Sequence, residues 1–504
     1  MLNLGIFSCD KKRCLTCIVL LLCSSFLWDL SFLRRETSWV ISIAFVPALI
    51  IVRKRLLNSF NSFWAGWLLG FIFFIFNLYW LKFIGVIPWI LLALLQGLFI
   101  GLWMFIISFK SDKLYSNSWR QILIPPLAWV IIEWLRAQGH FGMEWGGPAY
   151  SQHANLFIVQ WASIIGPYGV SGLILLMNTL IAGISECCFG TKQFFIKVSV
   201  VILTTAIITM VGNFLFSKKT EQESTLRVAL LQPSISQNEK WDKNNFNRHM
   251  LRFESMVIEA KQRGAELVIF PETAIPDYLL LSQEISNTVA KWAIDNKISL
   301  AVGGIDKEGA NEWNTLFFID KNGVMKGRYH KQHLVPFGEY IPFPFQALKG
   351  KIPILDLVGD YKRGNESPIF HTKELLWSVL ICFESTMPSL ARQAVKKGAK
   401  FIVVATNDAW FERSRAPFMH AAMGIFRGVE NGVSFVQAAN TGVSIIASPR
   451  GEVIAKADLF QSVVIVGGIT KPLPRTIYNI FGDWIVFFSV IVLAVYYKVL
   501  AFKK

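Results

Sequence analysis

Long apolar runs alternate with short polar segments through the first 220 residues of the chain, and another apolar run closes it. Each run approaches the ~20 residues that an α-helix needs to cross a bilayer. The pattern predicts a membrane domain of about seven helices over 1–220, and a last helix with a short tail over 479–504. The predicted spans lie near residues 14–33, 38–53, 59–82, 86–108, 121–138, 166–189, 196–216 and 484–500.

The region 221–478 has a different pattern, in which short apolar runs alternate with amphipathic segments. Alternating apolar strands and helices are typical of a sheet that helices cover, and about 250 residues can bury a sizeable core. We therefore predict an α/β domain here. Its strand-like runs include "LRVALLQPSI", "ELVIFPET", "SLAVGGID", "LLWSVLICFE" and "KFIVVATNDAW". Its helices are expected over 245–263, 283–296, 388–397 and 416–431.

Composition supports the membrane interpretation, because 53% hydrophobic residues is too apolar for a soluble chain of 504 residues. The net charge of +16 could suggest nucleic-acid binding. The Lys and Arg residues mostly flank apolar segments instead of forming a binding motif, however. We therefore expect no nucleic-acid partner.

The short loops between the apolar runs differ in basic charge. Lys and Arg in such loops resist translocation and mark the cytoplasmic side. One side collects Lys11, Lys12, Arg13, Arg53, Lys54, Arg55, Lys110, Lys113, Arg120, Lys192, Lys197, Lys503 and Lys504. The other side has Arg34, Arg35, Lys82 and Arg136. Both termini should therefore be cytoplasmic, and the region 221–478 should lie outside the cytoplasm.

Cys382 ends the apolar run "LLWSVLIC", and all the other cysteines precede residue 190. A cysteine in this setting is usually a small buried hydrophobe. In an exported domain, however, the environment favours oxidation and this cysteine has no partner within the domain. A residue at the carboxyl end of an α/β strand also faces the crevice where ligands bind. Cys382 is therefore a candidate nucleophile.

A cysteine nucleophile needs a base to form the thiolate and a positive group to hold the oxyanion. Glu272, in "VIFPETAIP", follows the end of another predicted strand. Lys331 and Glu339 lie in "YHKQHLVPFGEYIPF", which is rich in Pro and Gly. Taken singly, a loop carboxylate or a solvated lysine carries little weight. Together these groups could serve a reacting cysteine.

Taken together, these stretches resemble the nitrilase superfamily and, within it, the membrane-embedded apolipoprotein N-acyltransferases. The resemblance covers nearly the whole chain. Its motifs are "PETA" at 271–274, "YHKQHLVPFGEY" at 329–340, "ICFE" at 381–384, "TNDAWF" at 406–411, "ANTGVS" at 439–444 and the loop that begins "WGGPAY" at 145–150. It implies a nitrilase-like α-β-β-α sandwich beside a multi-span helical membrane domain, with no metal and no other cofactor.

The resemblance also implies residue roles. Glu272 would act as general base and acid, Lys331 would stabilise the oxyanion, and Cys382 would carry the acyl group as a thioester. Supporting roles would fall to Glu339 and Glu384, and substrate-binding roles to Trp241, Phe383, Asn407 and Trp410. The family often has Tyr where this chain has Phe383, so any hydrogen bond from that hydroxyl is in doubt.

Other interpretations stay open for several of these residues. Asn407 and Trp410 either line a pocket for the acyl chain or peptide, or pack within their loops. Trp145 lies in a loop expected near the bilayer, where an aromatic residue is more often an interface anchor than a substrate contact.

The implied activity is transfer of a fatty acyl chain from phospholipid to the α-amino group of a diacylglyceryl-modified lipoprotein. The enzyme would be a multi-pass protein of the inner (cytoplasmic) membrane, surrounded by membrane lipids, with its catalytic domain facing the periplasm.

Two alternatives remain. One is a membrane-tethered amidase that hydrolyses a small amide with the same three residues. The other is a transporter with an exported sensory domain, although polar residues such as Asp29, Asn77, Glu133 and Asn178 are few within the spans.

Overall fold

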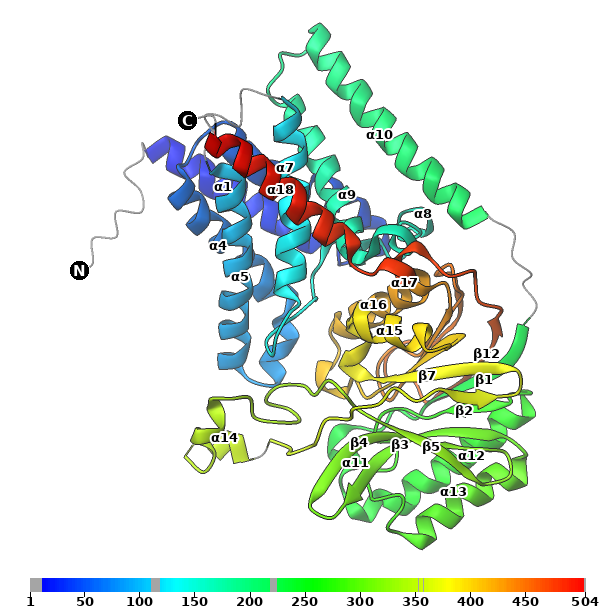
Figure 1. Cartoon of the computed structure of the whole chain (residues 1–504). Coiled ribbons are helices and arrows are strands. Elements are labelled where there is room, and N and C mark those ends of the chain that lie inside the picture. The colour runs from blue at the N-terminus through cyan, green and yellow to red at the C-terminus, as the bar shows by residue number, and fades with distance from the viewer. Residues whose placement is uncertain (1–10, 110–117, 218–223, 352, 357, 503–504) are drawn as a thin grey trace. The chain divides into compact units, whose positions relative to one another are not determined.

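The computed structural model describes residues 11–109, 118–217, 224–351, 353–356 and 358–502. The chain divides into two compact units, one of Met1–Lys218 with Phe481–Lys504 and the other of Lys219–Ile480. Figure 1 shows that the first unit is helical and that the second contains β-sheets with helices packed on them. The predicted domain boundary near residue 220 lies outside the described residues, as do Lys110, Lys113, Lys503 and Lys504 of the orientation argument.

The first unit consists of helices that follow the predicted apolar runs. Its α-helices are α1 (Lys11–Leu30), α2 (Ile41–Ala44), α3 (Val46–Arg53), α4 (Ser59–Asn77), α5 (Val86–Ser108), α7 (Ser118–Arg136), α8 (Leu156–Val159), α9 (Ala162–Ile184), α10 (Lys192–Ser217) and α18 (Trp484–Phe502). Short 3₁₀ turns join some of them, namely η1 (Arg35–Val40), η2 (Tyr79–Phe83) and η3 (Pro148–Gln152).

Among the described residues, six segments are long and apolar enough to cross a membrane. They are Lys11–Leu30, Arg35–Arg53, Ser59–Asn77, Val86–Ser108, Ala162–Ile184 and Lys192–Ser217. The other two predicted spans also form helices. However, α7 carries Arg120, Glu133 and Arg136, and the apolar part of α18 is the shorter stretch Trp484–Lys498. That these two helices cross the bilayer stays a prediction.

Aromatic side chains fill the interior of the first unit. The Trp28 ring stacks on Phe73 with 3.6 Å between the ring centroids, and Phe45 lies 4.8 Å from both Trp28 and Trp129. The α4 and α5 helices approach closely through glycines. A Cβ added at Gly70 would lie 2.7 Å from an Ile100 side-chain carbon. Small residues at such contacts are the usual means of packing helices in a membrane.

A buried polar network folds the loop after α7 into the same unit. The Arg136 guanidinium donates to the carbonyls of Met143 and Trp145 at 2.7 and 2.9 Å. Glu144 accepts hydrogen bonds from the hydroxyls of Tyr150 and Tyr168 at 2.6 and 2.7 Å. Trp145 is fully buried within this fold, so the expectation that it anchors the protein at the membrane interface was wrong. The sequence did not reveal that Arg136 draws this loop inward.

The second unit contains two six-stranded sheets. The first has the order β12-β1-β2-β3-β4-β5, and the second has the order β11-β10-β9-β8-β7-β6. The first sheet consists of β1 (Ser224–Gln232), β2 (Leu267–Ile269), β3 (Ser299–Glu308), β4 (Asn311–Ile319), β5 (Met325–His330) and β12 (Val463–Thr470). The second consists of β6 (Phe370–Thr372), β7 (Leu375–Ile381), β8 (Phe401–Thr406), β9 (Ser434–Ala439), β10 (Ile445–Ala447) and β11 (Val453–Lys456).

The central strands of each sheet run parallel, β1-β2-β3 in the first and β7-β8-β9 in the second. The strands towards the edges pair antiparallel. Parallel neighbours place their carboxyl ends at the same edge of a sheet. This arrangement brings the segments that follow β7 and β8 together.

Two sheets and their helices form the predicted α-β-β-α sandwich (Figure 1). The core between the sheets draws on both of them, and the Phe318 and Trp377 rings meet across it at 5.1 Å. Helices α12 (Phe246–Gln262) and α13 (Gln283–Asn296) cover the first sheet. Helices α15 (Pro388–Lys396) and α16 (Ala416–Asn431) cover the second. The remaining helices and turns are α11 (Gln237–Lys240), α14 (Pro353–Asp356), α17 (Ile477–Phe481), η4 (Lys243–Asn245), η5 (Phe345–Leu348), η6 (Cys382–Thr386) and η7 (Ala409–Phe411).

A close backbone approach beside β3 generates a prediction for the pair Gly303 and Gly304. A Cβ at Gly303 would lie 2.2 Å from the carbonyl oxygen of Pro271, whereas one at Gly304 would have its nearest neighbour, a Phe317 ring carbon, at an ordinary 3.4 Å. Because the obstacle at Gly303 is backbone, Gly303→Ala should destabilise the unit by roughly 1–3 kcal/mol. Thermal unfolding in detergent should show a lower Tm for Gly303→Ala and little change for Gly304→Ala. Equal Tm values for the two variants would contradict this packing.

Candidate active site

Three strand ends supply the backbone of the site, and each is followed by a residue in the left-handed conformation. After β2 comes Thr273 (φ 44°), after β7 comes Cys382 (φ 53°) and after β8 comes Asp408 (φ 52°). Residues other than glycine adopt this conformation at a cost of ~1–3 kcal/mol, and such strain tends to gather at functional sites. All three sharp turns therefore mark the place where the two sheets could present reactive groups.

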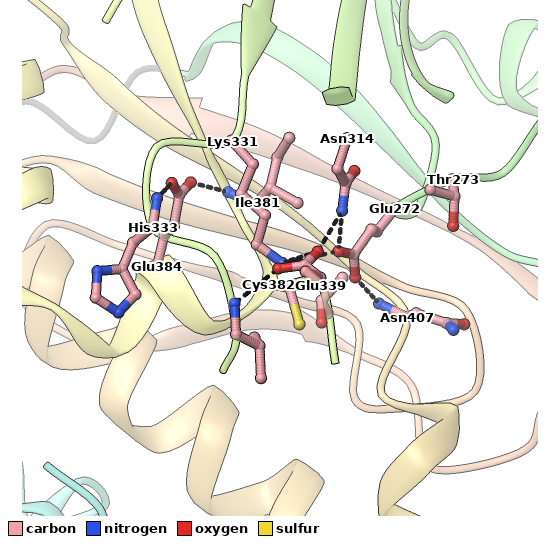
Figure 2. Close-up of polar contacts among 12 residues, drawn as sticks. Glu272, Thr273, Asn314, Lys331, His333, Glu339, Ile381, Cys382, Glu384 and Asn407 are labelled. Atoms are coloured by element: carbon pink, nitrogen blue, oxygen red, sulfur yellow. Dashed lines mark hydrogen bonds and ion pairs between the residues drawn. The ribbon is translucent and has the colours of Figure 1, made fainter. Parts of the chain in front are cut away.

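The Glu272 carboxylate is buried and hydrogen-bonded on both oxygens (Figure 2). Its Oε1 accepts from the Asn314 side-chain amide on β4 at 2.7 Å and from the Lys331 ammonium at 3.1 Å. Its Oε2 accepts from the backbone N–H of Asn407 at 3.1 Å. Burial acts to raise the pKa of this carboxyl, but Lys331 and the Asn314 hydrogen bond outweigh it and hold the pKa below its usual value. The site thus keeps Glu272 ionised.

Lys331 directly follows β5 and is almost completely buried. Its ammonium lies 3.1 Å from Glu272 Oε1 and 2.9 Å from Glu339 Oε1. Burial acts to lower the pKa of Lys331, but the two carboxylates raise it well above its usual value. Glu339 is held in turn by the Asn314 amide at 3.0 Å and by the Val335 N–H at 2.8 Å. A charged lysine therefore lies between two carboxylates that other residues hold in place.

Cys382 begins the turn η6 (Cys382–Thr386) at the end of β7 and is partly buried. Figure 2 shows it in the group formed by Glu272, Lys331 and Glu339. Burial raises the pKa of its thiol well above the usual value and the Glu272 carboxylate adds to the effect, while Lys331 opposes it. At rest the proton is therefore on sulfur and Glu272 is free of it. A general base must be unprotonated before it can accept the proton of a thiol, and Glu272 meets this requirement.

Glu384 holds the turn that carries Cys382. Its Oε2 accepts from the Ile381 N–H and from the Tyr329 hydroxyl, both at 2.7 Å. Its Oε1 accepts from the N–H groups of Gln332 and His333 at 2.6 and 2.8 Å. Burial raises the pKa of Glu384 to about 7 in spite of these donors. One side chain thus fastens the end of β7 to the segment that follows Lys331.

A second polar group lies behind Cys382. His420 on α16 places Nδ1 3.0 Å from Asp408 Oδ1, and its Nε2 is 2.7 Å from Ser385 Oγ and 3.1 Å from the Cys382 carbonyl oxygen. Burial acts to lower the pKa of His420, but Asp408 and the Cys382 carbonyl raise it. Since all of these side chains except that of Cys382 are buried, the group holds the turn from inside the protein.

The four predicted substrate-binding residues occupy different settings. Trp241 and Trp410 are 47% and 55% exposed, so both are accessible to a ligand. Phe383 is partly buried and its ring stacks near His333 at 6.3 Å. The Asn407 side chain is buried and hydrogen-bonded to Gln237 and Asn440, while its backbone contacts Glu272, and these contacts favour the loop-packing alternative. Substrate binding by these residues stays a prediction.

Several residues of the site were not found from the sequence. Asn314 and Lys240 have no separate signal in the sequence, and Asp408 lies within the "TNDAWF" motif without a role of its own. His420 is predicted to lie on a helix face with a structural role. Only the three-dimensional structure shows that Asn314 Nδ2 bridges Glu272 and Glu339. Within the described part of the chain, no group of three His, Cys, Asp or Glu side chains is arranged to hold a metal ion.

The four donors around Glu384 predict a sharp response to Glu384→Gln. An amide in place of the carboxylate turns one acceptor into a donor that faces two N–H or O–H groups. Each unsatisfied buried group costs about 1–3 kcal/mol. To avoid this cost the Cys382 turn should move away from the new amide group. That displacement should slow alkylation of Cys382 by iodoacetamide roughly tenfold or more. Tyr329→Phe removes only one donor and should have a smaller effect; an equal or larger effect for Tyr329→Phe would contradict this role.

The raised pKa of His420 predicts how stability changes with pH. A histidine whose pKa rises on folding stabilises the fold fully below its unfolded pKa, about 6.5, and this contribution is lost as pH rises through the folded value. His420→Leu should therefore reduce stability by about 1–3 kcal/mol at pH 6, and the difference from the wild type should shrink at higher pH. The check is Tm as a function of pH for both proteins.

His249 is a matched control for that measurement. It is also a buried histidine, but burial lowers its pKa, with further contributions from Arg248 and Arg252. The contribution of His249 to the stability of the fold should therefore have the opposite pH dependence, and it should be lost as pH falls. A His420→Leu difference that grows with rising pH would show that the imidazolium is not what stabilises the turn.

Comparison with known proteins finds relatives over nearly the full chain. Residues 227–475 match the family model for carbon-nitrogen hydrolases, and residues 24–180 match that for the apolipoprotein N-acyltransferase N-terminal domain. Apolipoprotein N-acyltransferase from Geobacter metallireducens is 31% identical over 91% of this chain and 90% of its own length. The enzyme of the same name from Rickettsia typhi is 30% identical over 86% of this chain and 88% of its own length.

A more distant likeness exists to a solved amidase from Nesterenkonia sp. It covers 52% of this chain and 95% of the amidase, with 18% sequence identity and a TM-score of 0.38. A likeness at that level carries no functional information. The two family matches and the relatives of similar length lead to one conclusion: the chain belongs to the apolipoprotein N-acyltransferase family.

Proposed function

We propose that this protein moves a fatty acyl chain from phospholipid, through a thioester on Cys382, to the α-amino group of a diacylglyceryl-modified lipoprotein. The observation that carries the proposal is the convergence of an ionised Glu272, a charged Lys331 and a protonated Cys382 thiol in one buried polar group. Family membership favours acyl transfer over the transporter alternative.

In the first step Glu272 takes the proton from the Cys382 thiol as the sulfur attacks the ester carbonyl of the phospholipid. Negative charge then develops on the carbonyl oxygen. Among the described residues, the Lys331 ammonium uses two of its three N–H groups on Glu272 and Glu339, and the third is left to donate to this oxyanion. Glu272 returns the proton to the departing alkoxide, so that lysophospholipid leaves and Cys382 holds a thioester.

In the second step the uncharged α-amino group of the lipoprotein attacks the thioester carbonyl. Glu272 takes a proton from the attacking nitrogen and gives it to the leaving sulfur. An amide forms and the Cys382 thiol is restored. Lysophospholipid leaves before the lipoprotein reacts, so the kinetics should be ping-pong.

The proposed setting is the inner (cytoplasmic) membrane, with Lys219–Ile480 on the periplasmic side and both termini in the cytoplasm. The unequal charge of the short loops supports this orientation. An acyl chain costs roughly 0.8 kcal/mol per CH₂ to expose to water, which gives an enzyme that uses phospholipid a reason to be embedded in the membrane. Its neighbours and its donor substrate would both be membrane lipids.

The amidase alternative uses the same three residues with water in place of the amine in the second step. It gives no role to the membrane helices. Release of ammonia from a small amide by the purified protein, without any lipid requirement, would support it over acyl transfer.

The decisive experiment follows the mass of the protein. Incubating the purified enzyme in detergent with phospholipid and no acceptor should add a fatty-acyl mass to the Cys382 peptide, and hydroxylamine should remove it. Cys382→Ala should not be labelled, and Glu272→Gln should be labelled about 10²–10⁴-fold more slowly because it lacks the base.

Glu259→Gln provides the matched control. It makes the same chemical change in the same unit, but at an exposed residue that pairs with Arg263, and it should be labelled at the wild-type rate. Acyl transfer from phospholipid by Cys382→Ala would refute the thioester mechanism. An unlabelled Cys382 in a folded wild-type protein would refute phospholipid as the donor.

A further inference from the structure

A second buried lysine lies beside Glu272, and the reaction described above does not use it. Lys240 ends α11, is 4% exposed, and donates to the Glu272 carbonyl oxygen at 2.9 Å and to the Thr273 hydroxyl at 2.6 Å. Both acceptors are neutral, unlike the carboxylates that receive Lys331. Burying an ammonium without a contacting carboxylate is costly, so a purely structural role would be served better by an uncharged donor.

The two hydrogen bonds of Lys240 fall on a strained part of the backbone. Thr273 has a φ of 44°, and both the carbonyl before it and its own hydroxyl are bound by the same ammonium. This contact fixes the direction in which the Glu272 side chain leaves the backbone. Across the same segment, Gly303 leaves no space for movement, because the Pro271 carbonyl already lies against it.

The same short helix also reaches the carboxylate end of Glu272. Gln237, at the start of α11, accepts a hydrogen bond from the Asn407 side-chain amide at 2.8 Å, and the Asn407 N–H donates to Glu272 Oε2. The segment before α11 is anchored by Asn440, which exchanges hydrogen bonds with the backbone of Ile235 at 3.0 and 2.8 Å. Helix α11 therefore holds Glu272 at its backbone directly and at its carboxylate through Asn407.

We propose that Lys240 is a positioning residue for Glu272, which fixes the Glu272–Thr273 backbone and supplies a second positive charge beside the buried carboxylate. This inference rests on the proposed role of Glu272 as the base for Cys382. The electrostatics agree with the geometry. Burial lowers the pKa of Lys240 to about 8, although Glu272 and Cys382 act to raise it. Lys240 in turn contributes to lowering the pKa of Glu272.

The test is the pH dependence of Cys382 alkylation by iodoacetamide in the full-length protein. This probe needs the thiolate but no lipid, and its rate should fall at acid pH as Glu272 becomes protonated. In Lys240→Met, which has similar length and no charge, the midpoint of this acid limb should rise by about one pH unit. Lys240→Arg keeps the charge and should bring the midpoint back towards the wild-type value.

Thr273→Val distinguishes the effect of the Lys240–Thr273 hydrogen bond from the effect of the Lys240 charge. It removes the hydroxyl that accepts from Lys240 but leaves the ammonium in place, so the rate at the plateau should fall while the midpoint of the acid limb stays. If Lys240→Met does not fold, Lys240→Gln replaces it, since Gln also lacks the charge and must raise the midpoint. Coincident acid limbs for the wild type and the uncharged variant would overturn the proposal.

The outcome is separable from that of the proposed function. A shifted acid limb in a protein that takes no acyl group from phospholipid would leave the role of Lys240 standing and remove the phospholipid donor. Acylation of Cys382 by phospholipid together with coincident acid limbs would support phospholipid as the donor and overturn the role of Lys240.

Discussion

The buried pair of Glu272 and Lys331 is the interaction on which the site depends. A carboxylate and an ammonium removed from water lose several kcal/mol of solvation each, and their attraction offsets this loss only when the remaining donors and acceptors are also satisfied. Here Asn314, Glu339 and the Asn407 N–H supply those partners. The geometry is therefore over-determined, and a charged base can persist beside a thiol that stays protonated.

Backbone strain and side-chain clamps occur together at this site. Each of the three left-handed residues of the site is bound by a polar group from another element: Thr273 by Lys240, Cys382 by His420, and Asp408 by the same His420. These partners come from α11 and α16, which are far apart in the sequence. The cost of the strained turns is thus offset by hydrogen bonds that also fix where Glu272 and Cys382 point.

The helices and strands could be predicted from the sequence because its periodicity is local. Predicted helices such as 283–296 and 416–431 match α13 and α16 residue for residue, and apolar runs such as the fully buried β8 predicted an α/β domain. The pairing of two sheets in an α-β-β-α sandwich was expected from the resemblance to the nitrilase superfamily and not from the periodicity. Contacts between distant segments could not be predicted in this way. The bridge from Asn314 to both carboxylates joins residues 25 and 42 positions apart, and the inward fold of Trp145 depends on Arg136.

In the mechanism we propose, the arrangement of charge also explains how one carboxylate would serve both halves of the transfer. Two lysines lie on opposite ends of Glu272, Lys331 at the carboxylate and Lys240 at the backbone carbonyl. When Glu272 accepts a proton its charge would vanish, while both ammonium groups remain and only the Glu339 carboxylate opposes them. This excess of positive charge would drive the proton onward to the leaving group. Because the imbalance is the same whether the proton came from sulfur or from nitrogen, the leaving alkoxide of the first step and the leaving thiolate of the second would be protonated from one unchanged site.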